Sequence, residues 1–204
     1  MNFFQKIIFA IFKFLFPSKG HCLENVIDGG AVVVCNHFSI ADCGYMLKLT
    51  PKKTYFLAKS ELTKHKLFWK MLSSFGALAI DRDNPSIKTM FTALKLIKKG
   101  HKLVIFPEGT RNKTGTTELQ PIKSGAGVFA VKAKCPIIPV MINKKAKPFI
   151  RSHFIVGEPF SLEEFYSKEL NEETIKEIDQ IIVDKMKEQQ QKLVELLETK
   201  KKWK

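Results

Sequence analysis

Residues 31–42 read Ala-Val-Val-Val-Cys-Asn-His-Phe-Ser-Ile-Ala-Asp, and this stretch decides the fold. Its first part, AVVVC at 31–35, is β-branched and has no polar break, which is typical of a strand buried on both faces of a sheet. Residues 39–49 follow with helical spacing. A fully buried strand that leads directly into a helix is the unit from which parallel sheets are built.

The same alternation continues outward along the chain. Further apolar runs with strand character lie at 54–58, 76–80, 102–106 and 137–142, and helical patterns lie at 61–74, 87–98 (with Pro85 suited to its first turn), 124–133 and 171–204. Alternating strands and helices predict an α/β fold, a single domain with a largely parallel central sheet flanked by helices. We expect the main domain at 21–160, an N-terminal helix at 1–20 and a long C-terminal helical extension at 161–204.

The N-terminus carries a dense apolar run, MNFFQKIIFAIFKFLF at 1–16, which Pro17 ends. It is too short to span a bilayer as one helix, since a span needs about 20 apolar residues. On a helix, Asn2, Lys6 and Lys13 share one narrow strip, and such a helix lies in the membrane interface with its lysines at the surface. A signal peptide is disfavoured because no small-x-small cleavage site follows, and a buried core helix is the third interpretation.

The C-terminal pattern, 171–204, places Ile175, Ile178, Ile182 and Met186 at helical spacing. It ends in the basic residues Lys200, Lys201, Lys202 and Lys204. Three roles remain open for this helix: packing on the core, contact with anionic lipid, or contact with a partner.

Composition points to anionic partners without choosing among them. The 204 residues are 45% hydrophobic, enough for one well-buried domain, and 34 basic against 20 acidic residues give a net charge of +14. A solvated, lysine-rich surface explains this charge as well as a phosphate or membrane partner does. The cysteines Cys22, Cys35, Cys43 and Cys135 have neither disulfide-framework nor zinc-ligand spacing, so we expect free thiols and no metal.

A candidate acid–base pair follows the buried strand. Strand carboxyl ends are where α/β sheets bind ligands, and His37 with Asp42 there supplies a base and a carboxylate to orient it. Two residues five apart on one helix lie about 140° apart around its axis and do not meet. We therefore place His37 ahead of the helix, Ser39 at its N-cap and Asp42 in its first turn. A His-x4-Asp pair alone arises in about one shuffled chain in seven.

Two further segments end in arginine. GALAIDR at 76–82 ends in Arg82 and FPEGTR at 106–111 ends in Arg111, and an arginine fork at a strand end suits a phosphate. Loop-closing salt bridges are the competing explanation. PIKSG at 121–125 adds a lysine before a helix start, which is a natural anion site. Pro139 interrupts a predicted strand, and we expect it at a sheet edge or strand start.

Taken together and in this order, NHFSIAD, GALAIDR, FPEGTR, PIKSG and Ile-Pro-Val resemble the motifs of the glycerolipid acyltransferases, specifically the 1-acylglycerol-3-phosphate acyltransferases. The resemblance implies that His37 is a general base oriented by Asp42. It also implies a glycerol-phosphate site whose residues are Arg82, Glu108, Gly109, Thr110 and Arg111, with Lys59 and Lys123 as helpers. Asn112 stands where the family often has serine, which affects only fine positioning.

The resemblance implies direct acyl transfer from an acyl thioester to the free hydroxyl of lysophosphatidate, forming phosphatidate. The thioester is a co-substrate carried by acyl carrier protein or coenzyme A, and no metal or redox cofactor is implied. Membrane lipid and an anionic membrane surface are the expected partners, at the cytoplasmic face of the cell membrane. Alternatives are another acceptor (glycerol 3-phosphate or another lysophospholipid) or a non-catalytic binder of anionic lipid or nucleic acid. Nucleic acid is not expected because no aromatic-interleaved basic motif is present.

Overall fold

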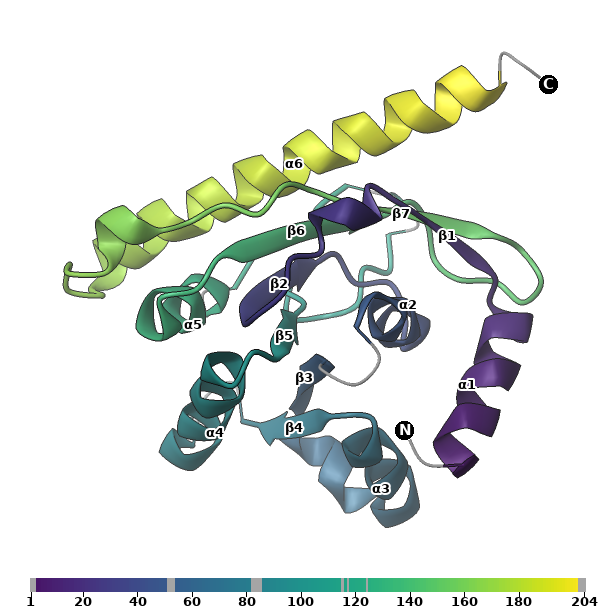
Figure 1. The fold of residues 1–204 in the computed structure, drawn as a ribbon, viewed down its shortest axis with the longest axis horizontal. Helices are drawn as coiled ribbons and strands as arrows, with labels where there is room; N and C mark the ends of the chain where they lie inside the picture. The colour runs from purple at the N-terminus through teal and green to yellow at the C-terminus, as the bar shows by residue number, and fades with distance from the viewer. Residues whose placement is uncertain are drawn as a thin grey trace.

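A seven-stranded sheet forms the centre of the computed structural model, which describes residues 3–50, 54–81, 86–114, 116, 118–123 and 125–201 (Figure 1). The strands are β1 (Ser18–His21), β2 (Ala31–Cys35), β3 (Thr54–Lys59), β4 (Ala77–Ile80), β5 (Lys102–Ile105), β6 (Ile137–Ile142) and β7 (Ser152–Val156). Their spatial order is β1-β7-β6-β2-β5-β3-β4, and every neighbouring pair is parallel except β6 with β7. The predicted α/β fold with a largely parallel sheet is confirmed.

Strand β2 lies between β5 and β6, and all five of its residues are buried. Val32 and Val34 join the core on one face of the sheet, whereas Ala31, Val33 and Cys35 join the core on the other face. Because both faces are covered, the strand has no polar position, and this explains the unbroken apolar run in the sequence.

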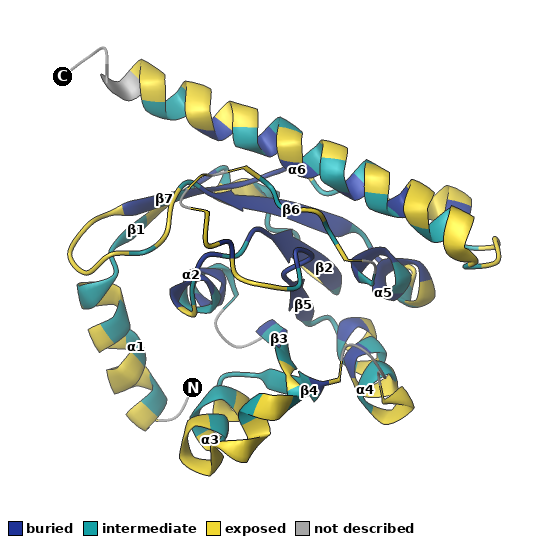
Figure 2. Ribbon diagram, turned by 180° about the vertical axis from the view of Figure 1, so that it is seen from behind, coloured by how far each residue is buried: buried dark blue, intermediate teal, exposed yellow. Residues whose placement is uncertain are grey.

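Helices cover both faces of the sheet (Figures 1 and 2). The helices are α1 (Phe3–Leu15), α2 (Ala41–Leu49), α3 (Lys66–Ser74), α4 (Ile87–Lys98), α5 (Ala126–Ala133) and α6 (Glu172–Lys201), with 3-10 turns η1 (Leu23–Asn25), η2 (Ser60–Lys64) and η3 (Glu163–Phe165). Buried residues of α4, α5 and α6 share one core, and those of α2 share the other with the inner face of α1. Pro85 and Ser124, which we expected at helix starts, lie outside the described residues.

The long C-terminal helix packs on the sheet. Ile178, Ile182 and Met186 of α6 are fully buried, and Ile178 lies against Gly127 of α5, where a Cβ would be 2.1 Å from its side chain. Of the three roles left open, packing on the core is the one that the structure shows. Lys202 and Lys204 lie outside the described residues.

Helix α1 packs with one side only. Phe9, Phe12 and Phe16 contact the core beneath α2, and the Phe12 ring lies against Gly44 and Tyr45. Gln5 Nε2 donates a hydrogen bond to the Ser74 carbonyl (2.6 Å), which joins α1 to α3. None of the helices in the described parts of the chain has the length and apolarity needed to cross a membrane.

Two predictions about secondary structure are wrong. The helix expected at 61–74 is divided into η2 and α3, and His65 leaves the helical conformation between them. Residues 63–66 are all exposed, so no packing holds a continuous helix there.

Pro139 is the second wrong prediction, because its strand β6 lies inside the sheet rather than at its edge. Its carbonyl accepts the Gly157 N–H (2.7 Å), and Ile137 pairs with Phe160. One extra residue therefore lies on the partner segment between these two contacts. The proline sits at a bulge just past the end of β7, where no ladder donor is needed.

Candidate active site

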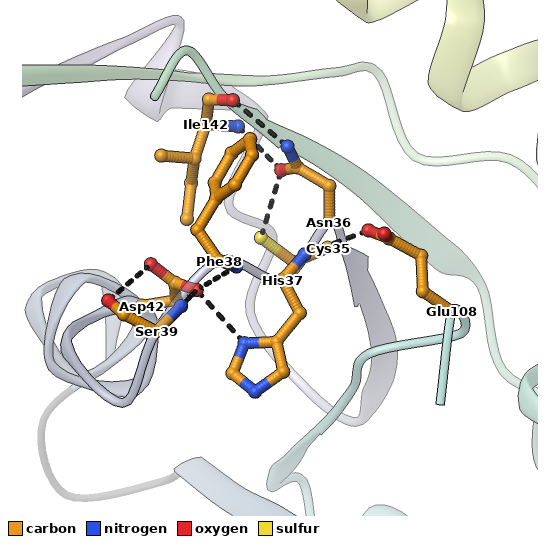
Figure 3. A network of polar contacts seen from close by, with 8 residues as sticks. All are labelled: Cys35, Asn36, His37, Phe38, Ser39, Asp42, Glu108 and Ile142. Carbon is orange, nitrogen blue, oxygen red and sulfur yellow. Dashed lines mark hydrogen bonds and ion pairs between the residues drawn. The ribbon is translucent and has the colours of Figure 1, made fainter. Parts of the chain in front are cut away.

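His37 lies in the loop that joins the carboxyl end of β2 to α2 (Figure 3). Its Nδ1 is 2.9 Å from Oδ2 of Asp42, which is in the first turn of α2 and completely buried. The predicted placement, with the histidine ahead of the helix and the aspartate on it, is confirmed. The carboxyl end of a central parallel strand is also the expected ligand-binding edge of such a sheet.

The Asp42 carboxylate organises the whole loop. Besides facing His37, Oδ2 accepts the backbone N–H groups of Phe38 (2.6 Å) and Ser39 (2.7 Å). Our assignment of Ser39 as the N-cap is wrong: Ile40 occupies that position, and no side chain caps the helix. The Ser39 hydroxyl instead points to Asp42 Oδ1 (3.5 Å). The Asp42 carboxylate itself accepts the backbone N–H groups of Phe38 and Ser39, which precede the helix.

The His37 ring packs on an aromatic side chain and is partly exposed to solvent. It stacks on Phe106, with 4.0 Å between ring centroids and 20° between planes, and 14% of its side chain is exposed. In Figure 3 the second ring nitrogen, Nε2, points away from Asp42. With Nδ1–H donated to the carboxylate, the neutral ring has an unprotonated Nε2 that can accept a proton.

Glu108 lies against the main chain of His37. Its buried carboxylate accepts the His37 N–H at Oε1 (2.8 Å). Burial raises the pKa of Glu108 from 4.5 to about 7; the backbone N–H groups of His37 and Gln120 oppose this rise, and the charge of Asp42 adds to it. The structure therefore places this predicted substrate-binding residue beneath the His37 loop rather than on its exposed side.

Two asparagines that sequence reasoning did not assign to the site fix this loop. Asn36 exchanges hydrogen bonds with the backbone of Ile142 on β6 (3.0 and 2.8 Å). The Asn112 N–H donates to the His37 carbonyl (2.6 Å), and the Asn112 side chain bonds Thr114 and Thr116 of its own loop. The Asn36 side-chain amide beside the histidine was an available signal, since buried backbone groups need partners. The Asn112 contact with His37 is made by a main-chain N–H and has no side-chain signal.

A basic cavity of about 460 Å³ opens beside the His37 loop. Its lining residues are Phe38, Ser39, Arg111, Asn112, Lys113, Thr116, Lys144 and Lys145. Four of these eight are cationic and none is acidic, so the cavity favours an anionic group. Lys144 and Lys145 were missed because lysines occur throughout the chain; the available signal was a lysine pair just after a predicted strand.

The other predicted residues fall around the same turn or lie elsewhere. Gly109 has a φ of +69° and donates its N–H to the Phe106 carbonyl (3.0 Å), a conformation that favours glycine, and Thr110 beside it is exposed. The Lys123 N–H donates to the Pro107 carbonyl (2.7 Å), while its side chain is exposed. Lys59 forms an exposed ion pair with Glu61. Arg82 lies outside the described residues.

Neither a thiol nucleophile nor a metal ligand set is evident in the described parts of the chain. All four cysteines are free. Burial raises the pKa of Cys43 to about 12 and raises that of Cys35 well above its usual value, with the negative charge of Asp42 adding to both. The reactive thiolate is therefore disfavoured at Cys35 and at Cys43. No group of three or more ligand side chains is gathered in these parts.

Comparison with known proteins agrees with the motifs. A family model described as Acyltransferase matches residues 18–143. Relatives named 1-acyl-sn-glycerol-3-phosphate acyltransferase include those of Cocos nucifera (38% identical over 118 residues, 55% of this chain and 37% of the relative) and Bacillus subtilis (31% over 144 residues, 68% and 70%). The Helicobacter pylori relative is 35% identical over 139 residues, 66% of this chain and 58% of the relative.

A solved structure supports the fold independently. The crystal structure of the 1-acyl-sn-glycerophosphate (LPA) acyltransferase PlsC from Thermotoga maritima superposes with a TM-score of 0.62 at 23% identity. The match covers 91% of this chain and 76% of that chain. Across the three sequence relatives the chain spans from 37% to 70% of their length.

Proposed function

The chain belongs to the acyltransferase family, and from that membership and its site we propose that it transfers an acyl group from an acyl thioester to the free hydroxyl of lysophosphatidate. The product is phosphatidate. The observation that carries this proposal is the His37–Asp42 contact of 2.9 Å at the carboxyl end of β2, beside a basic cavity. The acceptor is suggested by the activity that the names of the sequence relatives state.

In the proposed reaction His37 acts through Nε2. This nitrogen takes the proton of the acceptor hydroxyl while the oxygen attacks the thioester carbonyl carbon and a C–O bond forms. Collapse of the tetrahedral intermediate breaks the C–S bond, and the imidazolium returns the proton to the leaving thiolate. Asp42 holds the ring in the required tautomer and stabilises its positive charge between these two steps.

Hydrogen bonds on both sides of His37 support this role. Glu108 accepts its N–H, and the Asn112 N–H binds its carbonyl, so the backbone of the histidine is tied to the loop that carries Arg111. General-base catalysis depends on a fixed distance between the base and the hydroxyl. A histidine held at its ring and at its backbone meets that need.

The cavity beside Phe38 and Ser39 is the proposed site of the acceptor phosphate. Arg111 supplies a planar fork that suits phosphate, and Lys113, Lys144 and Lys145 add charge around it. Gly109 and Thr110 precede Arg111 in the same turn. The left-handed conformation of Gly109 is proposed to shape this turn, and the exposed Thr110 is proposed to donate hydrogen bonds to the ligand. Arg82, Lys59 and Lys123 remain proposed contributors on the strength of the motif resemblance.

The donor is proposed to be a thioester of coenzyme A or acyl carrier protein, without a metal or redox cofactor. The net charge of +14 suits either donor, since both carry anionic groups. Comparing thioester consumption with the two donors and one acceptor distinguishes them.

We further propose that α1 attaches the enzyme peripherally to the anionic cytoplasmic face of the cell membrane. Its outer face is apolar yet exposed, which is unfavourable in water and favourable in a bilayer interface. The exposed residues are Phe3, Phe4, Ile7, Ile8, Ile11 and Phe14. Lys6 and Lys13 are exposed on the adjoining strip, where their amines reach lipid headgroups.

The decisive test replaces His37 with alanine. The purified His37→Ala variant should lose acyl transfer from thioester to lysophosphatidate by at least roughly a thousandfold. The exposed His65→Ala variant is the matched control and should retain activity. Unchanged thermal unfolding in both variants excludes misfolding. Full activity in the His37 variant refutes the mechanism, and equal rates with glycerol 3-phosphate or another lysophospholipid refute the proposed acceptor.

A further inference from the structure

The turn between β6 and β7 holds an aromatic residue in a conformation that it rarely adopts. Phe149 has a φ of +60°, in the left-handed region, and it is 65% exposed. The turn is closed by the Ile150 N–H, which donates to the Lys147 carbonyl (3.2 Å), so Pro148 and Phe149 are its central residues. Glycine or asparagine is the usual residue at such a position. The strained Phe149 gains little burial in return, which points to a role outside the folding of the chain.

This turn is attached to the end of α1. The Phe149 N–H donates to the Leu15 carbonyl (2.7 Å), one of the groups left unpaired at a helix end. The rings of Phe14 and Phe149 meet edge to face, with 5.7 Å between centroids, and both remain exposed. Ile150 is 46% exposed beside them. The turn therefore extends the outer apolar face of α1 beyond the helix.

The chain around the turn is strongly basic. Between residues 143 and 151 it carries four cations and no acidic residue. These cations are Lys144, Lys145, Lys147 and Arg151, and all are exposed. Apolar side chains ringed by lysine and arginine match an anionic bilayer, in which acyl chains lie beneath negatively charged headgroups. A neutral apolar partner would leave these charges without counterparts.

We propose that the β6–β7 turn is a second membrane-contacting element, in which Phe149 and Ile150 enter an anionic bilayer together with the outer face of α1. This inference rests on the proposed attachment of α1 and adds a contact from a segment that is distant from α1 along the chain. Lys144 and Lys145 belong to the same segment and line the basic cavity, so membrane contact at the turn brings that cavity to headgroup level.

The test exploits the strain at position 149. Asparagine tolerates the left-handed conformation, so Phe149→Asn should keep or raise the thermal midpoint by up to a few degrees. The same variant should bind vesicles containing phosphatidylglycerol roughly five- to tenfold more weakly in a flotation assay. Phe91→Asn on α4 is the matched control, since Phe91 is 68% exposed, and it should bind vesicles like the wild type.

Measurements of acyl transfer distinguish the role of the turn from that of α1. Phe149→Asn should retain its rate on a short-chain, fully dispersed lysophosphatidate and lose rate only on acceptor embedded in vesicles. The α1 double variant Ile7→Asn/Ile11→Asn leaves the Phe14–Phe149 contact in place and tests the proposed helix attachment. If the α1 variant releases the enzyme but Phe149→Asn binds like the wild type, the inference is overturned and the proposed function stands. A lower thermal midpoint for Phe149→Asn, or a wild-type dimer that this variant dissociates, also overturns it.

Discussion

Glu108 shows how one buried group ties stability to pH. Its pKa is raised to about 7 in the folded protein, against an ordinary value of 4.5, because burial disfavours the charged form. Between these two values the folded state binds more protons than the unfolded state, so this group makes stability fall as pH rises from about 4.5 to about 7. Below that window Glu108 is protonated in both states and its burial costs no charge desolvation. Above the window it is ionised in both states, and the full cost of burying its charge lowers the stability.

Glu108→Gln removes this titration while keeping an oxygen that can accept the His37 N–H. We expect urea-unfolding curves of the wild type and the variant to diverge across the window, with the wild type losing stability relative to the variant. The measurement is the free energy of unfolding of both proteins at several pH values from about 4 to 8. Parallel pH dependences would contradict the raised pKa.

Kinetics distinguish two roles for Glu108: holding the His37 backbone, as its contact indicates, or binding phosphate, as its motif suggested. Because its carboxylate holds the His37 backbone, Glu108→Ala should lower kcat roughly ten- to a hundredfold and change KM for lysophosphatidate little. Glu108→Gln should recover most of kcat. A large rise in KM with an unchanged kcat would instead assign the residue to phosphate binding.

The Asp42 carboxylate both supplies a negative charge beside His37 and holds the loop through hydrogen bonds. Its Oδ2 accepts the backbone N–H groups of Phe38 and Ser39 and faces His37 Nδ1. An asparagine whose side-chain oxygen takes the place of Oδ2 can keep these contacts of the loop, but it carries no charge. We expect Asp42→Asn to stay folded and lose about a hundredfold or more in kcat. Asp42→Ala should also lose about 2–4 kcal/mol of stability, because buried donors are left unpaired. Thermal unfolding and thioester assays on both variants check this, and an active alanine variant would contradict it.

Sequence reasoning located the side-chain pair and missed contacts made to backbone. The spacing of His37 and Asp42 excluded a shared helix, and this was enough to place each correctly. Glu108, Asn36 and Asn112 act on main-chain atoms, and no side-chain pattern encodes a main-chain partner far along the chain. Lys144 and Lys145 line one cavity with Arg111 only because β6 and β5 lie on either side of β2 in the sheet, an order that residue spacing does not specify.

At the scale of elements, the docking of α1 depends on the absence of a side chain at Gly44. A Cβ there would lie 2.2 Å from the Phe12 ring. Glycine-to-alanine substitution inside a helix ordinarily stabilises it by about 1 kcal/mol, but the clash reverses the sign here. We expect Gly44→Ala to destabilise the fold by roughly 1–3 kcal/mol and to increase hydrogen exchange in α1.

A double-mutant cycle identifies the cause. In the Phe12→Ala background the added methyl meets no ring, so Gly44→Ala should be nearly neutral or stabilising there. The destabilisation caused by Gly44→Ala in the wild-type background should therefore exceed that in the Phe12→Ala background by more than about 1 kcal/mol. An equal cost of Gly44→Ala in both backgrounds would show that Phe12 is not what opposes a side chain at position 44.

Elements were predictable where periodicity and packing agree. The β-branched run at 31–35 became β2 with unchanged bounds, because burial on both faces demands such a sequence. The interruption at His65 and the bulge at Pro139 depend on tertiary contacts. Exposed residues around His65 have nothing to pack against, and the partner of Pro139 is a segment that follows β7. Local sequence carries neither fact.

On the scale of the whole molecule, α6 covers one face of the sheet while α1 and the β6–β7 turn lie at the end of the sheet near β1 (Figures 1 and 2). Exposed apolar residues and clustered cations coincide at α1 and this turn. The loop that leads from β6 to the turn also lines the cavity beside the His37 loop. One segment thus connects the proposed membrane contact with the proposed phosphate site, and both proposed sites lie on the same side of the molecule.

The electrostatic part of this attachment predicts a salt dependence that the apolar part lacks. Raising the ionic strength from about 0.05 M to about 0.5 M shortens the Debye length and screens exposed charges. Wild-type binding to phosphatidylglycerol vesicles should therefore fall at least roughly tenfold, since each cation near the surface contributes about 1 kcal/mol. The double variant Lys147→Gln/Arg151→Gln should bind more weakly at low salt with a shallower salt slope, whereas Phe149→Asn should bind more weakly with an unchanged slope. Flotation at a series of salt concentrations measures both quantities, and a salt-independent wild type would contradict the contribution of these cations.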